Sequence, residues 1–97
     1  MSAPPLPELA DALVDADTVE RLFDDLVGHA EILHVIVRGA SQRNASCADV
    51  PIHDARAWLL AGSINGVQVL YRWQGATWRD AILRNADGYR VVRMKVS

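Results

Sequence analysis

The sequence contains little of what usually identifies an activity or a compartment. It has one cysteine in 97 residues, Cys47, so no disulfide can form within the chain, and this usage is typical of a reducing compartment. No run approaches the roughly 18 apolar residues that span a membrane, and the first residues lack the basic and apolar segments of a secretion signal. We therefore expect a cytoplasmic protein that does not bind membranes.

The usual catalytic and phosphate-binding signatures are also absent. The sequence contains no GxGxxG, no P-loop, no GxSxG and no HExxH. Structural zinc sites usually have paired ligands roughly two to four residues apart, and His29, His34, His53 and Cys47 do not show this spacing. His53 follows Cys47 by six residues, but proximity in the sequence does not place an imidazole on a thiol. We expect no metal, no cofactor and a protein that is not an enzyme, with His34 a hydrogen-bonded core histidine.

The composition is that of a folded domain whose charges are unevenly distributed. Hydrophobic residues make up 51% of the chain and charged residues 23%, as in ordinary single domains. Residues 1–63 contain four arginines and ten acidic residues, a balance of −6, whereas residues 64–97 contain six basic and two acidic residues, a balance of +4. The two parts either neutralise each other within one fold or leave a basic surface for an anionic group or an acidic partner.

The last third of the chain predicts a sheet. Residues 67–73, 77–84 and 89–96 alternate with a period of two and are rich in β-branched and aromatic side chains. A Gln-Gly pair at 74–75 and an Asn-Ala-Asp-Gly segment at 85–88 separate the three runs. Both segments are typical of tight hairpins, because glycine adopts a positive φ at little steric cost. We expect a three-stranded antiparallel meander.

A two-residue loop at 74–75 also predicts which side chains share a face of the meander. The aromatic face carries both tyrosines and two tryptophans: Val67, Val69, Tyr71, Trp73, Trp78, Asp80, Ile82, Arg84, Tyr89, Val91, Arg93 and Lys95. The aliphatic face carries smaller apolar residues and arginines: Gln68, Leu70, Arg72, Thr77, Arg79, Ala81, Leu83, Arg90, Val92, Met94 and Val96.

Tyrosine, tryptophan and arginine are enriched where proteins bind partners. We therefore interpret the aliphatic face as the core and the aromatic face as a contact surface. The predicted partner-binding residues are Tyr71, Trp73, Trp78, Arg84, Tyr89 and Arg93. In the alternative interpretation the aromatic residues form the core, and cross-strand pairs such as Asp80 with Arg93 neutralise its charges.

Upstream of the meander, the apolar spacing predicts helices and one strand. After a proline-rich lead-in we expect a short helix over 7–14, then a helix over 18–29 capped by Asp17 or Thr18. A strand over 31–38 and a long polar loop over 39–49 follow. A helix over 52–61 then turns Ala55, Trp58 and Leu59 inward and stops at Gly62. Residues 1–17 are the lead-in with its short helix, and residues 18–97 are the single domain.

The predicted fold class is α+β. N-terminal helices, one strand, a third helix and the C-terminal three-stranded antiparallel meander give a four-stranded sheet with helices on one face. This element order resembles a truncated nuclear-transport-factor-like cone. The resemblance implies a curved sheet around a pocket and no shared functional residue.

Three short helices can cover only one face of this sheet, while both faces carry apolar bulk. We therefore predict a small non-enzymatic interaction or accessory protein, a homodimer or a subunit of an assembly, that binds a second copy or another protein. One alternative is a pocket protein or enzyme in which Asp80, Tyr71 and His34 line a cavity and Asp80 acts as a base. A further alternative is binding of single-stranded nucleic acid, which the acidic total charge disfavours.

Overall fold

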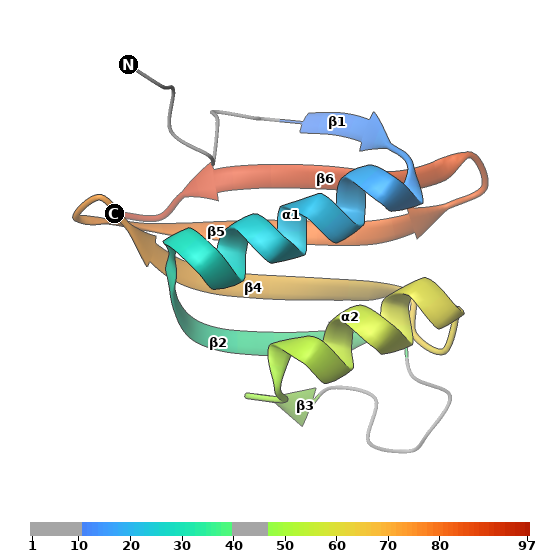
Figure 1. Ribbon diagram of the computed structural model, residues 1–97, viewed down its shortest axis with the longest axis horizontal. Coiled ribbons are helices and arrows are strands. Elements are labelled where there is room, and N and C mark those ends of the chain that lie inside the picture. Colours follow the sequence, from blue (N-terminus) through green and yellow to red (C-terminus); the bar gives the residue numbers. More distant parts are fainter. Residues whose placement is uncertain (1–10, 40–46) are drawn as a thin grey trace.

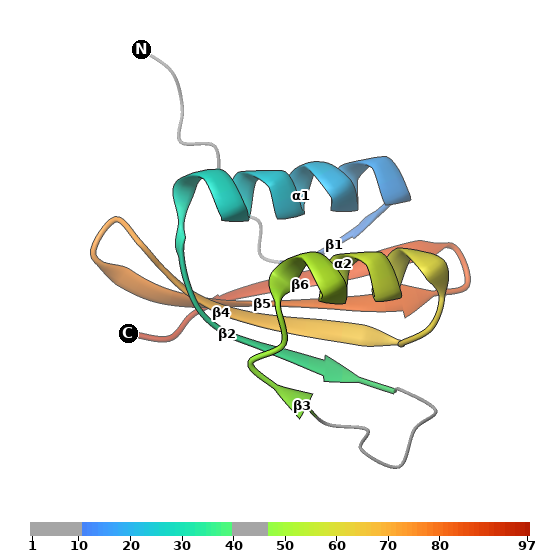
Figure 2. The same cartoon turned by 60° about the horizontal axis from the view of Figure 1, so that its bottom comes forward.

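The computed structural model describes residues 11–39 and 47–97, in which a six-stranded sheet carries two helices (Figure 1). The elements are β1 (Asp11–Val14), α1 (Ala16–His29), β2 (Glu31–Arg38), β3 (Cys47–Ala48), α2 (Ile52–Ala61), β4 (Gly66–Trp73), β5 (Ala76–Asn85) and β6 (Gly88–Lys95). All neighbouring strands are antiparallel, in the order β1-β6-β5-β4-β2-β3. Both helices lie on the same side of the sheet, so the molecule has two layers (Figure 2). The α+β class is confirmed.

The predicted meander is confirmed in its register as well as its existence. Trp73 lies opposite Ala76 across the first hairpin, as a two-residue loop requires. Residues 74 and 75 have φ values of 50° and 79°, which is the backbone of a type I′ turn. The second hairpin also has a two-residue loop, because Asn85 pairs with Gly88. Local turn chemistry therefore fixed which side chains of the meander share a face.

Helix α1 packs on the sheet through one apolar stripe. Val19, Phe23 and Leu26 are completely buried, as their spacing of four and three residues predicts. The helix begins at Ala16, before the predicted start, because its cap is Asp15. The Asp15 carboxylate accepts a hydrogen bond from the backbone N–H of Thr18 at 2.9 Å. The capping residue we expected was therefore wrong.

Helix α2 ends as predicted at Gly62, where a φ of 85° closes the last turn. Ala55 and Leu59 are fully buried against the sheet. Trp58 is 39% exposed, so its predicted inward position was wrong. Successive helical residues are rotated by about 100°, which turns Trp58 to the flank of α2 when Leu59 faces the sheet.

Two predictions about the chain before the meander were wrong. Residues 11–14, expected at the end of a helix, form β1 and pair with β6, from Asp11 opposite Val92 to Val14 opposite Tyr89. Residues 47 and 48, expected in a loop, pair with β2 as β3. The described part of the chain thus has two helices instead of three and six strands instead of four. The remainder of the predicted first helix, residues 7–10, lies outside the described residues. Strand β1 satisfies backbone groups at the edge of β6 that a helix would leave unpaired.

The largest correction concerns which face of the meander is the core. The buried side chains of the meander all belong to the aromatic face: Val67, Val69, Tyr71, Asp80, Ile82, Val91 and Arg93. The aliphatic face is open, and Leu83, Met94 and Val96 are 40%, 52% and 45% exposed. The alternative interpretation was therefore correct. Large aromatic and branched side chains of the central strands bury more apolar area than the smaller residues opposite, and the charges among them neutralise each other.

Candidate functional site

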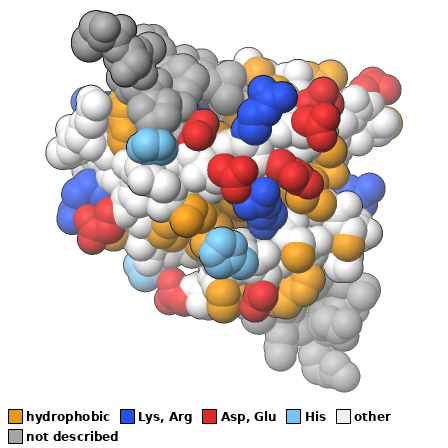
Figure 3. Space-filling model, viewed as in Figure 1, with side chains coloured by type: hydrophobic (Ala, Val, Ile, Leu, Met, Phe, Trp, Pro, Cys, Tyr) orange, Lys and Arg blue, Asp and Glu red, His pale blue; other side chains and the backbone are white. Residues whose placement is uncertain are grey.

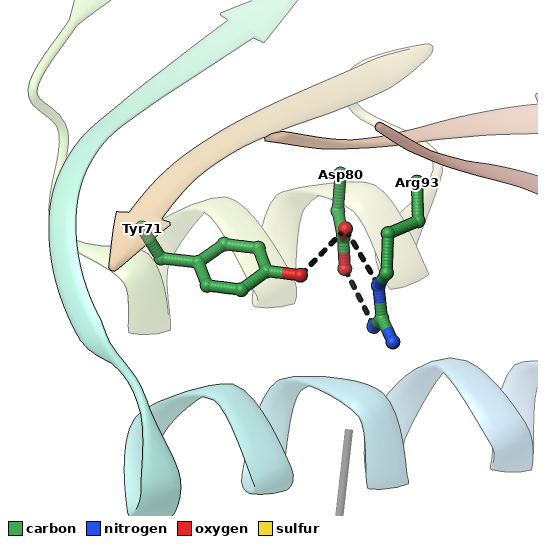
Figure 4. A network of polar contacts seen from close by, with 3 residues as sticks. All are labelled: Tyr71, Asp80 and Arg93. Atoms are coloured by element: carbon green, nitrogen blue, oxygen red, sulfur yellow. Dashed lines mark hydrogen bonds and ion pairs between the residues drawn. The ribbon is translucent and has the colours of Figure 1, made fainter. Parts of the chain in front are cut away.

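Beneath the helices, the aromatic face contains a buried network of three polar side chains (Figure 4). Asp80 of β5 and Arg93 of β6 are register partners and form a bidentate ion pair. Arg93 donates from Nε to Oδ1 of Asp80 at 2.9 Å and from Nη2 to Oδ2 at 2.8 Å. Tyr71 of β4 donates its hydroxyl to Oδ1 at 2.9 Å. Both carboxylate oxygens of Asp80 are therefore occupied.

The environment holds Tyr71 and Arg93 each in one protonation state. Burial raises the pKa of the Tyr71 hydroxyl well above its ordinary 10.0, and the charge of Asp80 raises it further. Burial by itself lowers the pKa of Arg93, but the hydrogen bonds and charge of Asp80 outweigh that effect, so the net pKa is raised. Tyr71 stays a hydrogen-bond donor and Arg93 a cation at any physiological pH, which is typical of a structural ion pair.

This geometry bears on the alternative in which Asp80 is a base in a cavity. A base needs a free carboxylate oxygen directed at a substrate, and Asp80 has a basic partner and a tyrosine on its two oxygens. His34, expected beside it, lies on the opposite face of the sheet, as its pairing with Leu70 shows. The cross-strand pair that we considered for Asp80 and Arg93 is confirmed, and the network gives proton transfer no support.

The predicted partner-binding residues do not form an open surface. Tyr71 and Arg93 are 1% and 6% exposed, so a contact role for these two was wrong. Trp73, Trp78 and Tyr89 are half-buried against the core, the two tryptophan rings meeting edge to face with centroids 6.2 Å apart. The sixth residue, the exposed Arg84, lies over Gly62 at the end of α2. The six residues thus range from buried to exposed on the side of the sheet that carries the helices.

The opposite side of the sheet has no covering element in the described part of the chain, and we call it the open face. The strand register shows that the open face consists of the aliphatic face of the meander together with residues of β1 and β2. From β1 across to β2, its residues are Asp11, Leu13, Arg90, Val92, Met94, Val96, Thr77, Arg79, Ala81, Leu83, Gln68, Leu70, Arg72, Glu31, His34, Ile36 and Arg38. Of the six exposed large hydrophobic residues in the described ranges, four lie on this face: Leu13, Leu83, Met94 and Val96. Most of the exposed large hydrophobic side chains of the described ranges therefore lie on this face.

Sequence reasoning missed the contribution of β1 to this face. Leu13 is 55% exposed and lies opposite Arg90, in line with Leu83 of β5. Residues 11–14 are one aspartate followed by three apolar residues, which does not distinguish a strand from the end of the helix that we predicted.

Ion pairs lie at the margins of the open face. Arg90 donates two hydrogen bonds to Asp11, at 3.0 and 2.7 Å, which lower the pKa of the Asp11 carboxyl and raise that of Arg90. On the other side, Arg72 lies 3.3 Å from Glu31. These pairs are exposed, and they leave the apolar residues between them uncovered.

At the outer edge of the sheet, His34 hydrogen-bonds through Nδ1 to the Asp49 carboxylate. The predicted hydrogen bond of His34 is thus present, but its predicted core position was wrong, because the side chain is 55% exposed. Strand β2 turns His34 to the open face together with Ile36, since the two residues alternate with the buried Val35 and Val37.

Two other arginines of the open face, Arg38 and Arg79, have no ion-pair or hydrogen-bond partner for their side chains within residues 11–39 and 47–97. Arg38 is exposed at the end of β2. The Nε atom of Arg79 is buried between neighbouring side chains with its N–H unsatisfied. An unsatisfied buried donor is unfavourable, and this atom has too little accessible surface for an acceptor outside the fold to reach it.

The helical side of the molecule has the opposite charge. Residues 15–29 contain five acidic residues and one arginine, and acidic side chains gather over the helices (Figure 3). Arg56 of α2 joins the two helices, lying 2.7 Å from Asp24 and 3.7 Å from Glu20 of α1. The charge asymmetry of the sequence is therefore an asymmetry between an acidic helical side and an open face with four arginines and two acidic residues.

The candidate metal ligands are dispersed. His29 ends α1, His53 lies in the first turn of α2 and His34 is on the open face. Across residues 11–39 and 47–97, no three side chains of histidine, cysteine, aspartate or glutamate come together as a metal would require.

Comparisons with known proteins do not assign this chain to a family. No family model matches the sequence, no curated protein matches it, and no solved structure matches the fold. The resemblance to a nuclear-transport-factor-like cone stays a prediction. Neither described helix has the length and hydrophobicity needed to cross a bilayer. Function has to be argued from the surface of the molecule.

Proposed function

We propose that this protein is a small non-enzymatic interaction protein that self-associates through the open face of its sheet. The observation that carries the proposal is the placement of four exposed aliphatic side chains on one face of a sheet whose other face is already covered. Antiparallel sheets of this kind usually turn polar residues to water on the uncovered side. Exposed apolar side chains gathered on one face in this way are uncommon on a monomer and typical of an interface.

The open face is large enough for a stable dimer. Strands β4, β5 and β6 contain 8, 10 and 8 residues, and at about 3.3 Å per residue an eight-residue strand is about 26 Å long. Six strands spaced about 4.8 Å apart span about 24 Å. The projected area of the sheet is therefore about 600 Å². Because side chains protrude from the sheet, the accessible area is larger than this projection and comes close to the ~800 Å² that each partner buries in a standard interface.

The polar residues of the open face also fit an interface. Leu83 and Met94 lie on the inner strands β5 and β6, and the Asp11–Arg90 and Glu31–Arg72 pairs lie towards the margins, as in the polar rim of many interfaces, while Leu13 lies on the edge strand β1. Arg79 is the exception, because it lies on β5 in the middle of the face with an unsatisfied Nε. A second protein surface would exclude water from the apolar residues.

The other functions suggested by the sequence gain no comparable support. Single-stranded nucleic acid is bound largely by stacking on aromatic rings, whereas the exposed apolar side chains of the open face are aliphatic. The catalytic alternative depends on Asp80, whose oxygens are occupied by Tyr71 and Arg93.

The proposal is tested by the mass of the protein in solution. We expect light scattering and sedimentation equilibrium to give a concentration-dependent dimer for the natural chain, and a monomer for Met94→Asp, which buries a charge if the face is an interface. Val27→Asp is the matched control, because Val27 is 44% exposed but lies on α1, on the other side of the molecule. A natural chain that stays monomeric at millimolar concentration would contradict the proposal, as would equal weakening by the two substitutions.

A further inference from the structure

We infer that the second copy packs face to face on the first about a two-fold axis that runs across the strands, so that Arg38 of each copy pairs with Glu31 of the other. The inference rests on the proposed self-association and specifies its geometry. It begins from one strand, β2, which carries an acid at its first residue and a base at its last, both on the open face.

The register places these two charges at opposite ends of the open face. Glu31 lies opposite Arg72, and Arg38 lies opposite Gly66. Seven residues of extended chain separate them by about 23 Å. The side chain of Glu31 is 63% exposed in its contact with Arg72, so it can accept a second guanidinium. Arg38 is exposed and lacks a carboxylate partner in the described part of the chain. Two copies of β2 that run in opposite directions therefore place opposite charges next to each other at both ends.

Symmetry leaves two aligned ways of stacking two identical faces. The two-fold axis must lie in the plane between the sheets, either across the strands or along them. With the axis across the strands, each strand lies over its own copy in the reverse direction, within the crossing of about 30° that packed sheets adopt. Strand β2 then lies over β2, which brings Glu31 to Arg38 twice, once at each end of the interface.

The same arrangement matches the middle of the open face. Reversal of β6 brings Val92 over Met94 of the second copy, an aliphatic contact that also occurs twice. Reversal of β5 brings Arg79 over Ala81 of the second copy. Gln68 is the register partner of Ala81 on β4, so its amide oxygen lies within reach of an Arg79 from above. That oxygen is an acceptor that suits a guanidinium N–H.

The axis along the strands gives a less favourable interface. It reverses the order of the strands, so that β6 of one copy lies over β2 of the other. Arg90 then lies over Arg38 twice, and Glu31 lies over the apolar Val96. Juxtaposed like charges at an interface disfavour binding strongly. The charge pattern of the open face therefore selects the axis across the strands.

The test uses two opposite charge reversals, Arg38→Glu and Glu31→Arg, first separately and then mixed. In either variant alone, both symmetry-related pairs become like-charged, and we expect self-association to weaken by about tenfold or more. In an equimolar mixture, the heterodimer regains opposite charges at both positions. We expect native mass spectrometry to show heterodimers in excess of both homodimers, with a dissociation constant within about threefold of the natural chain. Arg21→Glu, on the exposed side of α1, is the matched control and should leave the dimer unchanged.

The possible outcomes separate this inference from the proposed function. A natural chain that dimerises while the mixture does not recover contradicts the orientation and leaves the interface standing. A stronger homodimer of Arg38→Glu also contradicts the proposed orientation. It would indicate that residue 38 lies opposite Arg90 of the other copy, as it does when the axis runs along the strands. A monomeric natural chain contradicts both claims and points to an acidic partner protein or another segment of the chain on the open face. Because Glu31→Arg also removes the contact with Arg72, the chain carrying both reversals is the second measurement, and its homodimer should recover as well.

Discussion

The two sides of the sheet contain nearly the same ion pair in different surroundings. On the covered side, Arg93 holds Asp80 through two hydrogen bonds of 2.9 and 2.8 Å, and the two side chains are 2% and 0% exposed. On the open face, Arg90 holds Asp11 through two hydrogen bonds of 3.0 and 2.7 Å, and those side chains are 54% and 48% exposed. The bidentate geometry is the same, and both pairs involve neighbouring strands of the same sheet.

The difference teaches that surroundings, rather than geometry, decide what such a pair contributes. Away from water, neither charge of the covered pair can be solvated if its partner is removed, so each depends on the other. In the open-face pair, water replaces the lost partner at little cost. The covered pair therefore helps specify the fold, whereas the exposed pair is free to serve as the margin of an interface.

The largest expected effect comes from breaking the covered pair. Asp80→Ala leaves the buried Arg93 without its carboxylate, and we expect the free energy of unfolding to fall by about 3–5 kcal/mol. Asp11→Ala makes the same chemical change on the open face and should have a much smaller effect. Urea unfolding of both variants at neutral pH checks this, and equal losses would contradict the distinction between the two sides.

A smaller effect should follow from removing the third member of the covered network. Tyr71→Phe deletes the hydroxyl that donates to Asp80 and keeps the ring in the core. Hydrogen bonds to charged groups typically contribute about 1.5–3 kcal/mol, and we expect a loss in that range. Tyr89→Phe is the control, since Tyr89 is half-buried and its hydroxyl has no hydrogen-bond partner within the described ranges. Thermal or urea unfolding that ranks the two variants in the reverse order would show that the network does not stabilise the fold.

The smallest effect concerns the open-face pair and appears as a pH dependence. The hydrogen bonds from Arg90 lower the pKa of Asp11 from its ordinary 3.8 in the folded protein. Such a carboxylate stabilises the fold above its unfolded pKa, and this contribution is lost as the pH falls through the folded value. The difference in unfolding free energy between the natural chain and Asp11→Asn should therefore be present at pH 6, begin to fall near the unfolded pKa of about 4, and disappear only as the pH falls through the lower folded value. High salt should reduce it, because exposed charges are screened. A difference that grows on acidification would contradict the assigned pairing.

Much of the fold was predictable because it depends on interactions between near neighbours in the chain. The turn at 74–75 set the register of β4 and β5, and the same parity predicted Asp80 beside Arg93. The spacing of Val19 and Phe23 gave the buried stripe of α1, and Gly62 gave the end of α2. In each case one or a few residues fix a local geometry, whatever lies around them.

The candidate site was less predictable, because it depends on what each surface meets. The residue types of the aromatic face suggested an interface, yet the same tyrosines and tryptophans serve equally well as a core. The strand at 11–14 forms only because β6 offers an unpaired edge, which no local pattern reveals. The open face was consequently assigned to the core, and its paired and unpaired arginines had no predicted role.

The sequence alone determined the α+β class, the hairpin registers, and the division of the meander into two sets of side chains. Only the tertiary structure decided which set the helices cover, because alternation along a strand separates two faces without ranking them. The ranking comes from the total area that α1 and α2 bury, and from the ability of Asp80 and Arg93 to satisfy each other once water is excluded. That choice left Leu83, Met94 and the unpaired Arg38 on the outside, where the proposed second copy binds.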